Sequence, residues 1–334
     1  MTRTMTAQPG AGPSENVRTA VFAPSPVVSV SVEAVAEAMA EKVTEVHFHA
    51  GGQGFWVGRM IQRLGVTVTL CAVLGGETGT VLRCLIAGEG LELRGVQSEL
   101  WNGAYVHDRR GGERKVIVET SPAPLRRHDL DALYTATLAA AIDAGTCVLT
   151  GTTQEVLPAD TYRRLAHDLG HNGVEVVVDL SGAPLAAALE GGVGLVKLSH
   201  EEVVRDGYAG SDGVDDLVDA IGKLQAAGAR DVVISRSGEP VLACLDGRLL
   251  EADVPRVEVV EPRGAGDAMT ATLAVARARR YAAEDMLRAA VAAGSLNTAR
   301  HGLATGERED VERLARDVSV RTLQTAAHPD GVCR

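Results

Sequence analysis

The sequence predicts an α/β protein with a central, mostly parallel sheet, helices on both faces of that sheet, and a small β lid. From residue 129 onward, short apolar strands alternate with helix-forming runs, which is the order that right-handed βαβ crossovers require. Hydrophobic residues make up 46% of the chain but aromatic residues only 3%, so small aliphatic side chains must fill the core. Between residues 95 and 119 the alternation of strands and helices stops, which indicates the accessory sheet.

The first segments are predicted as strands. Residues 19–33 hold an apolar strand, a proline-containing break at 23–26, and then alternating Val and Ser residues, the pattern of a half-buried strand. Residues 45–49 alternate in the same way and place His47 and His49 on one face. We expect these histidines to face solvent or a cleft; metal binding is the alternative, but the sequence offers no third ligand nearby.

Glycine-rich turns then introduce helices. Residues 51–54 precede an amphipathic helix over 55–64, and a strand over 66–73 leads through 75–79 into a helix over 80–89. The later predicted elements are helices 129–143, 158–170, 184–190 and 212–227 and strands 147–149, 174–178, 195–197 and 232–234.

The accessory sheet is predicted from strands near 27–33 and 45–49 and from a hairpin over 103–119 that turns at 109–112. A sheet of this size beside a larger one is suited to act as a lid. In the larger sheet, ligands gather at the carboxyl ends of parallel strands. Loops at those ends are 151–154, 179–182, 199–202, 235–238 and the loop before Asp267.

The segment 261–270, EPRGAGDAMT, is the strongest candidate site. It follows a strand-like run at 254–260 and opens an Ala-rich helix over 268–280, which places Gly264, Ala265 and Gly266 at a helix N-terminus. Free N–H groups and the positive end of the helix dipole stabilise phosphate oxygens there. Asp267 is suited to take a proton from a hydroxyl, and the alternative is an ordinary acid in the first turn of a helix.

Composition limits the classes of function. The net charge of −11 argues against broad binding to nucleic acid or to anionic membranes. No run of about 18 apolar residues is present, and the first 16 residues lack the apolar core of a secretory signal. The five cysteines are dispersed without C-x-x-C spacing, so we expect neither a disulfide framework nor a zinc site, and we expect a reducing, cytoplasmic setting.

Several motifs occur in order along the chain: GGQG at 51–54, LGGETG at 74–79, VLTG at 148–151, VVVDLSG at 176–182, KLSHEE at 197–202 and GAGD at 264–267. Over residues 19–305 the sequence resembles the ribokinase-like, PfkB family of carbohydrate kinases, nearest to its 1-phosphofructokinase and tagatose-6-phosphate kinase branch. The resemblance implies a ribokinase-like domain over 19–320, with a flexible N-terminal tail at 1–18 and a C-terminal tail at 321–334. It also implies a lid-mediated homodimer.

The resemblance implies an ATP-dependent kinase that uses Mg²⁺ and phosphorylates a hydroxyl of a sugar, a sugar phosphate or a sugar-like alcohol such as a cyclitol. Asp267 would be the general base, and the N–H groups of Gly264, Ala265 and Gly266 would hold the charge of the transferred group. Glu202 would organise Mg²⁺ through water, although Ser199 replaces the Asn of the family's motif. The implied nucleotide-side residues are Lys197, Ser199, Glu202, Ser235, Ser237, Gly238, Arg263 and Asn297.

Two of these residues have simpler alternatives. Glu202 can also be interpreted as an ordinary acid in the first turn of a helix. Asn297 can also be interpreted as a polar residue on the surface of a helix. The substrate-side motifs depart from the family's pattern: a carboxylate is replaced by Ser29, a Lys by Gln53 and an Asn by Trp56, and a lid Arg is missing. The implied substrate-side residues are Ser29, Gly51, Gly52, Gln53, Trp56 and Tyr105.

Losing two cations weakens the expected grip on a phosphorylated sugar, because each charge-assisted hydrogen bond contributes about 1.5–3 kcal/mol. A less charged or bulkier substrate therefore fits better, with Trp56 as a stacking surface. The alternative function is a catalytically silent homologue that binds a metabolite or nucleotide as a regulatory protein. A nicotinamide-binding protein is disfavoured, because no G-x-G-x-x-G follows the first strand.

Overall fold

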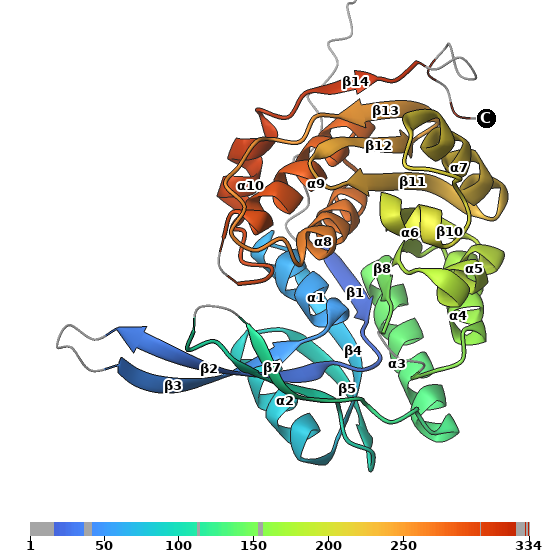
Figure 1. The fold of residues 1–334 in the computed structure, drawn as a ribbon. Helices are drawn as coiled ribbons and strands as arrows, with labels where there is room; N and C mark the ends of the chain where they lie inside the picture. Colours follow the sequence, from blue (N-terminus) through green and yellow to red (C-terminus); the bar gives the residue numbers. More distant parts are fainter. Residues whose placement is uncertain are drawn as a thin grey trace, which may run out of the picture.

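A ten-stranded sheet forms the centre of the molecule (Figure 1). The computed structural model describes residues 17–36, 42–111, 114–152, 156–300, 302–324, 331 and 333. Most of the predicted N-terminal tail, residues 153–154 of one predicted loop and most of the predicted C-terminal tail at 321–334 therefore lie outside the described residues. The strand order is β14-β13-β12-β11-β10-β9-β8-β1-β4-β5. Its strands are β1 (Arg18–Phe22), β4 (Thr67–Gly75), β5 (Glu92–Ser98), β8 (Thr146–Thr150), β9 (Glu175–Asp179), β10 (Val193–Ser199), β11 (Ala229–Arg236), β12 (Glu239–Leu245), β13 (Arg248–Ala252) and β14 (Val320–Thr322).

The strands from β5 to β11 are parallel, and β12, β13 and β14 extend the sheet antiparallel. Because helices cover both faces, the strands read as near-continuous apolar runs. One buried cluster contains α1, α2, α8, α9 and α10, and the other contains α3 to α7. None of the described helices is long and apolar enough to cross a membrane. The helices are α1 (Gln53–Arg63), α2 (Gly76–Gly88), α3 (Arg127–Ala144), α4 (Asp160–His171), α5 (Gly182–Gly191), α6 (His200–Arg205), α7 (Val214–Ala226), α8 (Ala265–Ala278), α9 (Ala283–Thr298) and α10 (Arg308–Ala315).

A second, four-stranded sheet projects from this body (Figure 1). It has the order β3-β2-β6-β7 and corresponds to the predicted lid. Its strands are β2 (Val27–Ala36), β3 (Lys42–Gly51), β6 (Ala104–Asp108) and β7 (Lys115–Thr120). The prediction of a small accessory sheet from these segments is confirmed, with residues 112–113 of the hairpin outside the described part.

The side chain of Asn102 ties the base of the lid to the central sheet. Its Oδ1 accepts a hydrogen bond from the Gly75 N–H at 2.9 Å, and its Nδ2 donates to Pro26 O at 3.1 Å and Val73 O at 2.9 Å. Asn102 is only 4% exposed, so these backbone groups have no easy access to water in its place. One buried amide therefore fixes the point at which the lid leaves the body.

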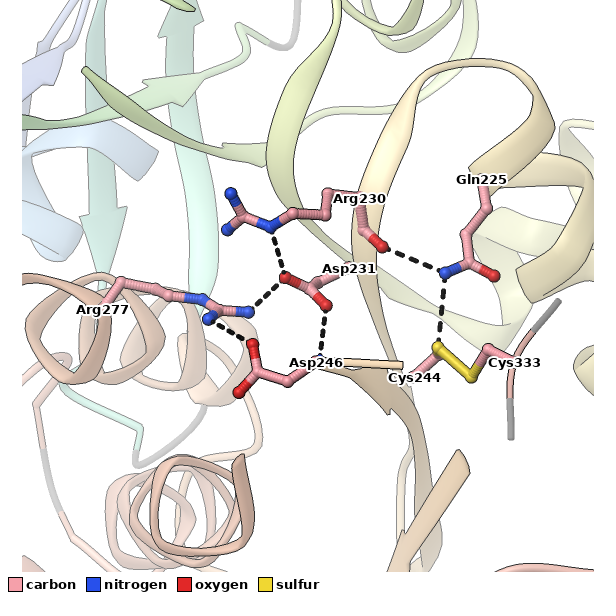
Figure 2. Close-up of a disulfide and its surroundings, with 7 residues drawn as sticks. All are labelled: Gln225, Arg230, Asp231, Cys244, Asp246, Arg277 and Cys333. Carbon is pink, nitrogen blue, oxygen red and sulfur yellow. Dashed lines mark hydrogen bonds and ion pairs between the residues drawn. A yellow bond between two sulfur atoms is a disulfide. The ribbon is translucent and has the colours of Figure 1, made fainter. Parts of the chain in front are cut away.

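The outer edge of the central sheet carries a disulfide. Cys244 of β12 is bonded to Cys333, 89 positions later in the chain, while Cys71, Cys84 and Cys147 are free (Figure 2). The expectation that the dispersed cysteines form no disulfide is wrong for this pair, because folding places residues together that sequence spacing keeps far apart. The predicted domain boundary at residue 320 falls within β14, which pairs with β13.

An ionic cluster next to this edge holds the C-terminal end of α8 (Figure 2). Asp231 of β11 is fully buried and accepts hydrogen bonds from Arg230 Nε at 2.9 Å, from the Asp246 N–H at 2.8 Å and from Arg277. Arg277 also donates to Asp246 Oδ1 at 3.0 Å. Helix α8, whose other end carries Asp267, is therefore fixed to the sheet by a buried charge pair.

The predicted strand at 254–260 is wrong. β13 ends at Ala252, and residues 253–259 form no regular structure. Pro255 lacks the N–H that a ladder needs, and the side chains of Val259 and Val260 are 62% and 41% exposed, so the apolar pattern had no sheet to pack against. The antiparallel strands β12 and β13, and helices α9 and α10, are elements that the sequence reading did not predict.

We expect Asn102→Ala to lower the free energy of unfolding by about 2–3 kcal/mol, because it leaves buried backbone groups without partners. Urea unfolding followed by circular dichroism measures this change. Gln97→Ala on the exposed side of β5 is the matched control, and we expect a change of less than about 0.5 kcal/mol. Equal effects of the two substitutions would show that Asn102 does not anchor the lid.

Candidate active site

The N-terminus of α8 lies at the end of the sheet where the parallel strands finish. Gly264 precedes the helix with φ of 77°, a left-handed conformation that glycine adopts without strain. Ala265 opens the helix, and Asp267 lies in its first turn. The first N–H groups of a helix have no partner within it, so this turn presents donors and a positive dipole end. The predicted geometry of the GAGD segment is therefore confirmed.

A lysine is packed against this turn. Lys197 of β10 is 5% exposed, and its Nζ lies 3.6 Å from Asp179 Oδ2. A Cβ atom added to Gly266 would lie 2.4 Å from that Nζ, so only glycine fits there without moving the ammonium group. Thr270, one turn further along α8, donates to Asp179 Oδ2 at 2.6 Å. The cluster brings β9, β10 and α8 to one point.

The charges of this cluster shift each other's protonation. Desolvation by burial and the neighbouring Asp179 carboxylate raise the pKa of Asp267 to about 7, against a smaller opposing effect of Lys197. Burial alone lowers the pKa of Lys197, but Asp179, Glu202 and Asp267 outweigh that effect and hold it above its ordinary value. A carboxyl group whose pKa lies near neutral pH is suited to general-base catalysis.

Gln53, the first residue of α1, contacts the same carboxylate. Its Oε1 accepts a hydrogen bond from the Gly151 N–H at 2.9 Å, and its side chain hydrogen-bonds to Asp267 and lowers the pKa of that residue. The sequence reading placed Gln53 on the substrate side. In the structure its amide lies between the loop after β8 and Asp267, and its predicted contact with substrate stays a prediction.

Glu202 and Ser199 form a capping box at the start of α6. The Ser199 Oγ accepts from the Glu202 N–H at 3.2 Å, and Glu202 Oε2 accepts from the Ser199 N–H at 2.8 Å and from its Oγ at 3.0 Å. The alternative interpretation of Glu202 as a first-turn helix acid is thus present in the structure. Its charge still acts on both Lys197 and Asp267.

The remaining residues predicted to lie on the nucleotide side are at the end of β11, in the turn after it and in the loop before α8. Ser235 pairs in register with Ser199 on the neighbouring strand, and Ser237 has φ of 53° in the turn to β12 that includes Gly238. Arg263 pairs with Glu261 at 2.6 Å and is 42% exposed at its side chain, on the loop that leads into GAGD.

Asn297 is buried, so its interpretation as a surface residue of a helix is wrong. It is 1% exposed, its Nδ2 donates to Arg263 O at 2.7 Å, and its Oδ1 accepts from the Ala304 N–H at 2.9 Å. Both ends of its amide hold backbone, which joins the loop before Gly264 to the loop after α9. The structure thus assigns Asn297 a supporting role for the GAGD turn.

The predicted substrate-side residues lie on the lid and at its base. Ser29 of β2 pairs in register with His49 of β3 and Tyr105 of β6, so these side chains share one face. Burial, and then the charge of Arg59 on α1, lower the pKa of His49. The base of the lid is formed by Gly51 and by Gly52, whose φ of 100° turns the chain into α1.

Trp56 of α1 completes this group, with its ring 3.6 Å from the position of a Cβ on Gly51. His47 and His49 stack with their ring centroids 6.2 Å apart. In the described part of the chain, no group of three or more His, Cys, Asp and Glu side chains is arranged to hold a metal ion. A metal ion at the candidate active site would therefore be held by oxygens of the bound ligand as well as by protein groups, as Mg²⁺ often is.

Sequence reasoning missed two members of the site, Asp179 and Thr270. Asp179 lies in the segment 176–182 and Thr270 in the segment 261–270. The sequence contained a signal for Asp179, because a carboxylate directly follows three buried valines at the carboxyl end of a strand. Thr270 had none, since a threonine in an Ala-rich helix has many ordinary explanations.

Comparisons with known proteins agree with this geometry. The family model described as "pfkB family carbohydrate kinase" matches residues 27–310. The chain is 27% identical over 276 residues to a 1-phosphofructokinase of Bacillus subtilis (strain 168), covering 82% of this chain and 89% of that protein. It is 28% identical over 272 residues to the ATP-dependent 6-phosphofructokinase isozyme 2 of Escherichia coli (strain K12), covering 80% and 87%.

Solved structures give the same result. Phosphofructokinase-2 from Escherichia coli in complex with potassium superposes with a TM-score of 0.79 at 25% identity, covering 90% of this chain and 99% of that one. Arabidopsis thaliana ribokinase shares the fold, with a TM-score of 0.70 at 19% identity over 90% and 99% of the two chains. The predicted ribokinase-like fold is confirmed, and the chain belongs to the pfkB family of carbohydrate kinases, phosphotransferases that act on a hydroxyl acceptor.

Proposed function

We propose that this protein transfers the γ-phosphate of ATP to a hydroxyl group of a sugar or sugar-like alcohol, with Asp267 as the general base. The observation that supports this most strongly is the raised pKa of Asp267 beside the free N–H groups of α8. A carboxylate with a pKa near 7 and a set of anion-stabilising donors on the same turn are the two groups that phosphoryl transfer to an alcohol needs.

In the proposed reaction, Asp267 takes the proton of the acceptor hydroxyl as its oxygen attacks the γ-phosphorus. The bond from that phosphorus to the β,γ-bridging oxygen breaks, and ADP leaves. The N–H groups at 264–266 stabilise the charge on the transferred group without reorganising, because the helix already fixes their direction. Gln53 orients the Asp267 carboxylate through its hydrogen bond.

The residues present fit a nucleotide and Mg²⁺. The absence of a Cβ at Gly266 lets the Lys197 ammonium group approach the turn closely, which places a cation beside the N–H groups that would face a phosphate. Glu202, one oxygen of which is not engaged in the capping box, would contact Mg²⁺ through water. Mg²⁺ supplies charge neutralisation for the phosphate oxygens of ATP.

The lid favours an acceptor of low charge. On its polar face stand Ser29, His49 and Tyr105, and the lowered pKa of His49 keeps that imidazole neutral at pH 7. Gln53 carries a neutral amide, so it supplies no charge either. We propose an uncharged or bulky acceptor, such as a cyclitol or modified sugar. A panel of free and phosphorylated sugars, cyclitols and nucleosides with Mg·ATP, analysed by mass spectrometry, tests the substrate.

The pH dependence of the reaction follows from the pKa of Asp267. Because the base must be deprotonated, we expect kcat/KM to rise from acid to neutral pH and to fall about tenfold per pH unit well below 7. Asp267→Asn should lower kcat by about 10²- to 10⁴-fold, because it removes the proton acceptor. Steady-state kinetics from pH 5 to 9 measures both effects.

Asp267→Asn should lower activity but raise the stability of the fold at alkaline pH. The folded pKa of about 7 lies above the ordinary 3.8, so the contribution of Asp267 to stability is full below about pH 3.8 and is lost as pH rises through 7. We therefore expect Asp267→Asn to raise Tm at pH 8 and not at pH 4. An inactive variant with lowered Tm would point to misfolding, and an active one would remove Asp267 from the mechanism.

Gln53→Leu tests how the base is oriented. Loss of the hydrogen bond should lower kcat about tenfold with little change in KM for ATP, and should move the acidic limb of the pH profile to higher pH. Gln62→Leu, on the same helix, is the control that should leave both unchanged. If Gln53→Leu lowered kcat while the limb stayed in place, its bond to Asp267 would not govern the base.

The second face of the lid supports a homodimer. Val30 pairs in register with Phe48 and Val106, and Val106 with Val118, so an apolar surface forms in which Phe48 is 52% and Val118 46% exposed. Exposed apolar surface of this kind marks an association site. We propose that a second copy of the chain covers it.

We expect Phe48→Ser to weaken self-association at least tenfold, as measured by sedimentation velocity over a range of concentrations. Ile142→Ser is the matched control, because Ile142 is 47% exposed on α3, outside the lid. A wild-type protein that sediments as a monomer at all concentrations would contradict the proposed dimer.

A further inference from the structure

The disulfide between Cys244 and Cys333 lies at the end of the molecule away from the candidate active site. Cys244 pairs in register with Val232, in the middle of β11, whereas Ser235 and the following turn lie at the end of that strand. β12 carries the chain from that turn to Cys244. The pair is therefore separate from the groups that hold Asp267 and Lys197.

Backbone contacts dock Gly331 and Cys333 beside the outer strands. Leu249 of β13 donates to Gly331 O at 2.7 Å, and the Cys333 N–H donates to Gly247 O at 3.0 Å. Gly331 has φ of 67°, and a Cβ added there would lie 2.2 Å from Thr322 Cγ2 on β14. Residues 331 and 333 thus lie against the outer strands in a way that depends on a glycine as well as on the covalent bond.

The two sulfurs differ in access and in surroundings. Cys244 is fully buried, while Cys333 is half-buried. The Gln225 Nε2 donates to Cys244 Sγ at 3.3 Å and to Arg230 O at 3.0 Å, as Figure 2 shows. Cys333 is therefore the more accessible residue of the pair, and an amide donor is already directed at the Cys244 sulfur, which would leave as a thiolate.

We propose that Cys244 and Cys333 form a reversible thiol–disulfide site, with low-molecular-weight thiols and disulfides as its reactants, that fastens the C-terminal residues to β13 and β14. Unlike a lone cysteine, the site has a partner thiol, a docked backbone and a hydrogen-bond donor for one sulfur. Its oxidised form closes a loop between residues 89 positions apart, which restricts the unfolded chain.

The chemistry balances with one small disulfide, RSSR. The Cys333 thiolate attacks RSSR to give a mixed disulfide and one RS⁻, and the Cys244 thiolate then attacks the Cys333 sulfur and releases the second RS⁻. The two protons of the protein thiols end on two RSH, and two electrons pass from the cysteines to RSSR. In the reverse direction a thiolate attacks Cys333, and Cys244 leaves as a thiolate that accepts the Gln225 hydrogen bond.

The test compares full-length protein equilibrated with oxidised glutathione and with dithiothreitol. We expect the oxidised form to show three free thiols of the five after unfolding without reductant, and a Tm roughly 5–10 °C above the reduced form. Cys333→Ser should match the reduced wild type in both conditions. Cys84→Ser, which removes an exposed free thiol, is the control and should keep the full redox-dependent shift.

Two further variants test the parts of the site separately. Gln225→Leu should slow reduction of the disulfide by dithiothreitol severalfold. If Gln225 had only a structural role, its loss would loosen the packing around Cys244 and make reduction faster instead. Gly331→Val should lower the fraction oxidised at a fixed glutathione ratio, because the segment no longer docks on Thr322. Five free thiols under both conditions, or the same Tm for the oxidised and the reduced protein, would overturn the proposal.

Discussion

The candidate site depends on one buried ammonium group that faces several carboxylates. Lys197 lies beside Asp179 and within the electrostatic reach of Glu202 and Asp267, in surroundings from which water is largely excluded. At 4 Å, two unit charges interact by about 4 kcal/mol at the effective dielectric of a protein surface, and more strongly inside. A single cation cannot fully compensate three carboxylates, so the protonation of one of them must shift. The pKa of Asp267 is raised, because burial desolvates its carboxylate and the neighbouring Asp179 carboxylate repels a second negative charge.

This arrangement is held by groups at both ends of α8. At its N-terminus, Gly266 leaves room for the Lys197 ammonium, and Thr270 donates to Asp179. At its C-terminus, Arg277 is bonded to the buried Asp231. The helix between them consists mainly of small, buried residues that pack closely, so its two ends keep a fixed position relative to each other. An unfavourable charge can therefore persist at Asp267 because the surrounding contacts fix its backbone.

The sequence predicted the fold class, the lid and the GAGD turn because each depends on local pattern. Strand and helix periodicity, glycine at helix starts and residues at strand ends are all written within a few positions. The capping of Ser199 by Glu202 was equally local, so the simpler interpretation of Glu202 could be foreseen. The features that the sequence could not predict depend on contacts between segments that are far apart in the chain.

Asn297 illustrates that limit. Its two backbone partners belong to Arg263 and Ala304, and nothing in the sequence near 297 shows that either loop passes there. The Cys244–Cys333 pair is the same case over 89 positions. Residues 254–260 show the converse: an apolar pattern alone predicts a strand, but without a neighbouring strand to pair with, and with Pro255 in it, the segment stays irregular.

The two faces of the lid explain how substrate residues can change while the fold is kept. Side chains alternate along a strand, so Ser29 and His49 share the polar face while Val30 and Phe48 share the other. A substitution on the polar face leaves the apolar face unchanged, and the register that separates them is fixed by the pairing of β2 with β3 and β6. The residues on the polar face of the lid are thus free to diverge, whereas the GAGD turn is packed against Lys197, which pairs with Asp179. Under the proposed function, specificity can therefore vary on the lid while the chemistry stays at the start of α8.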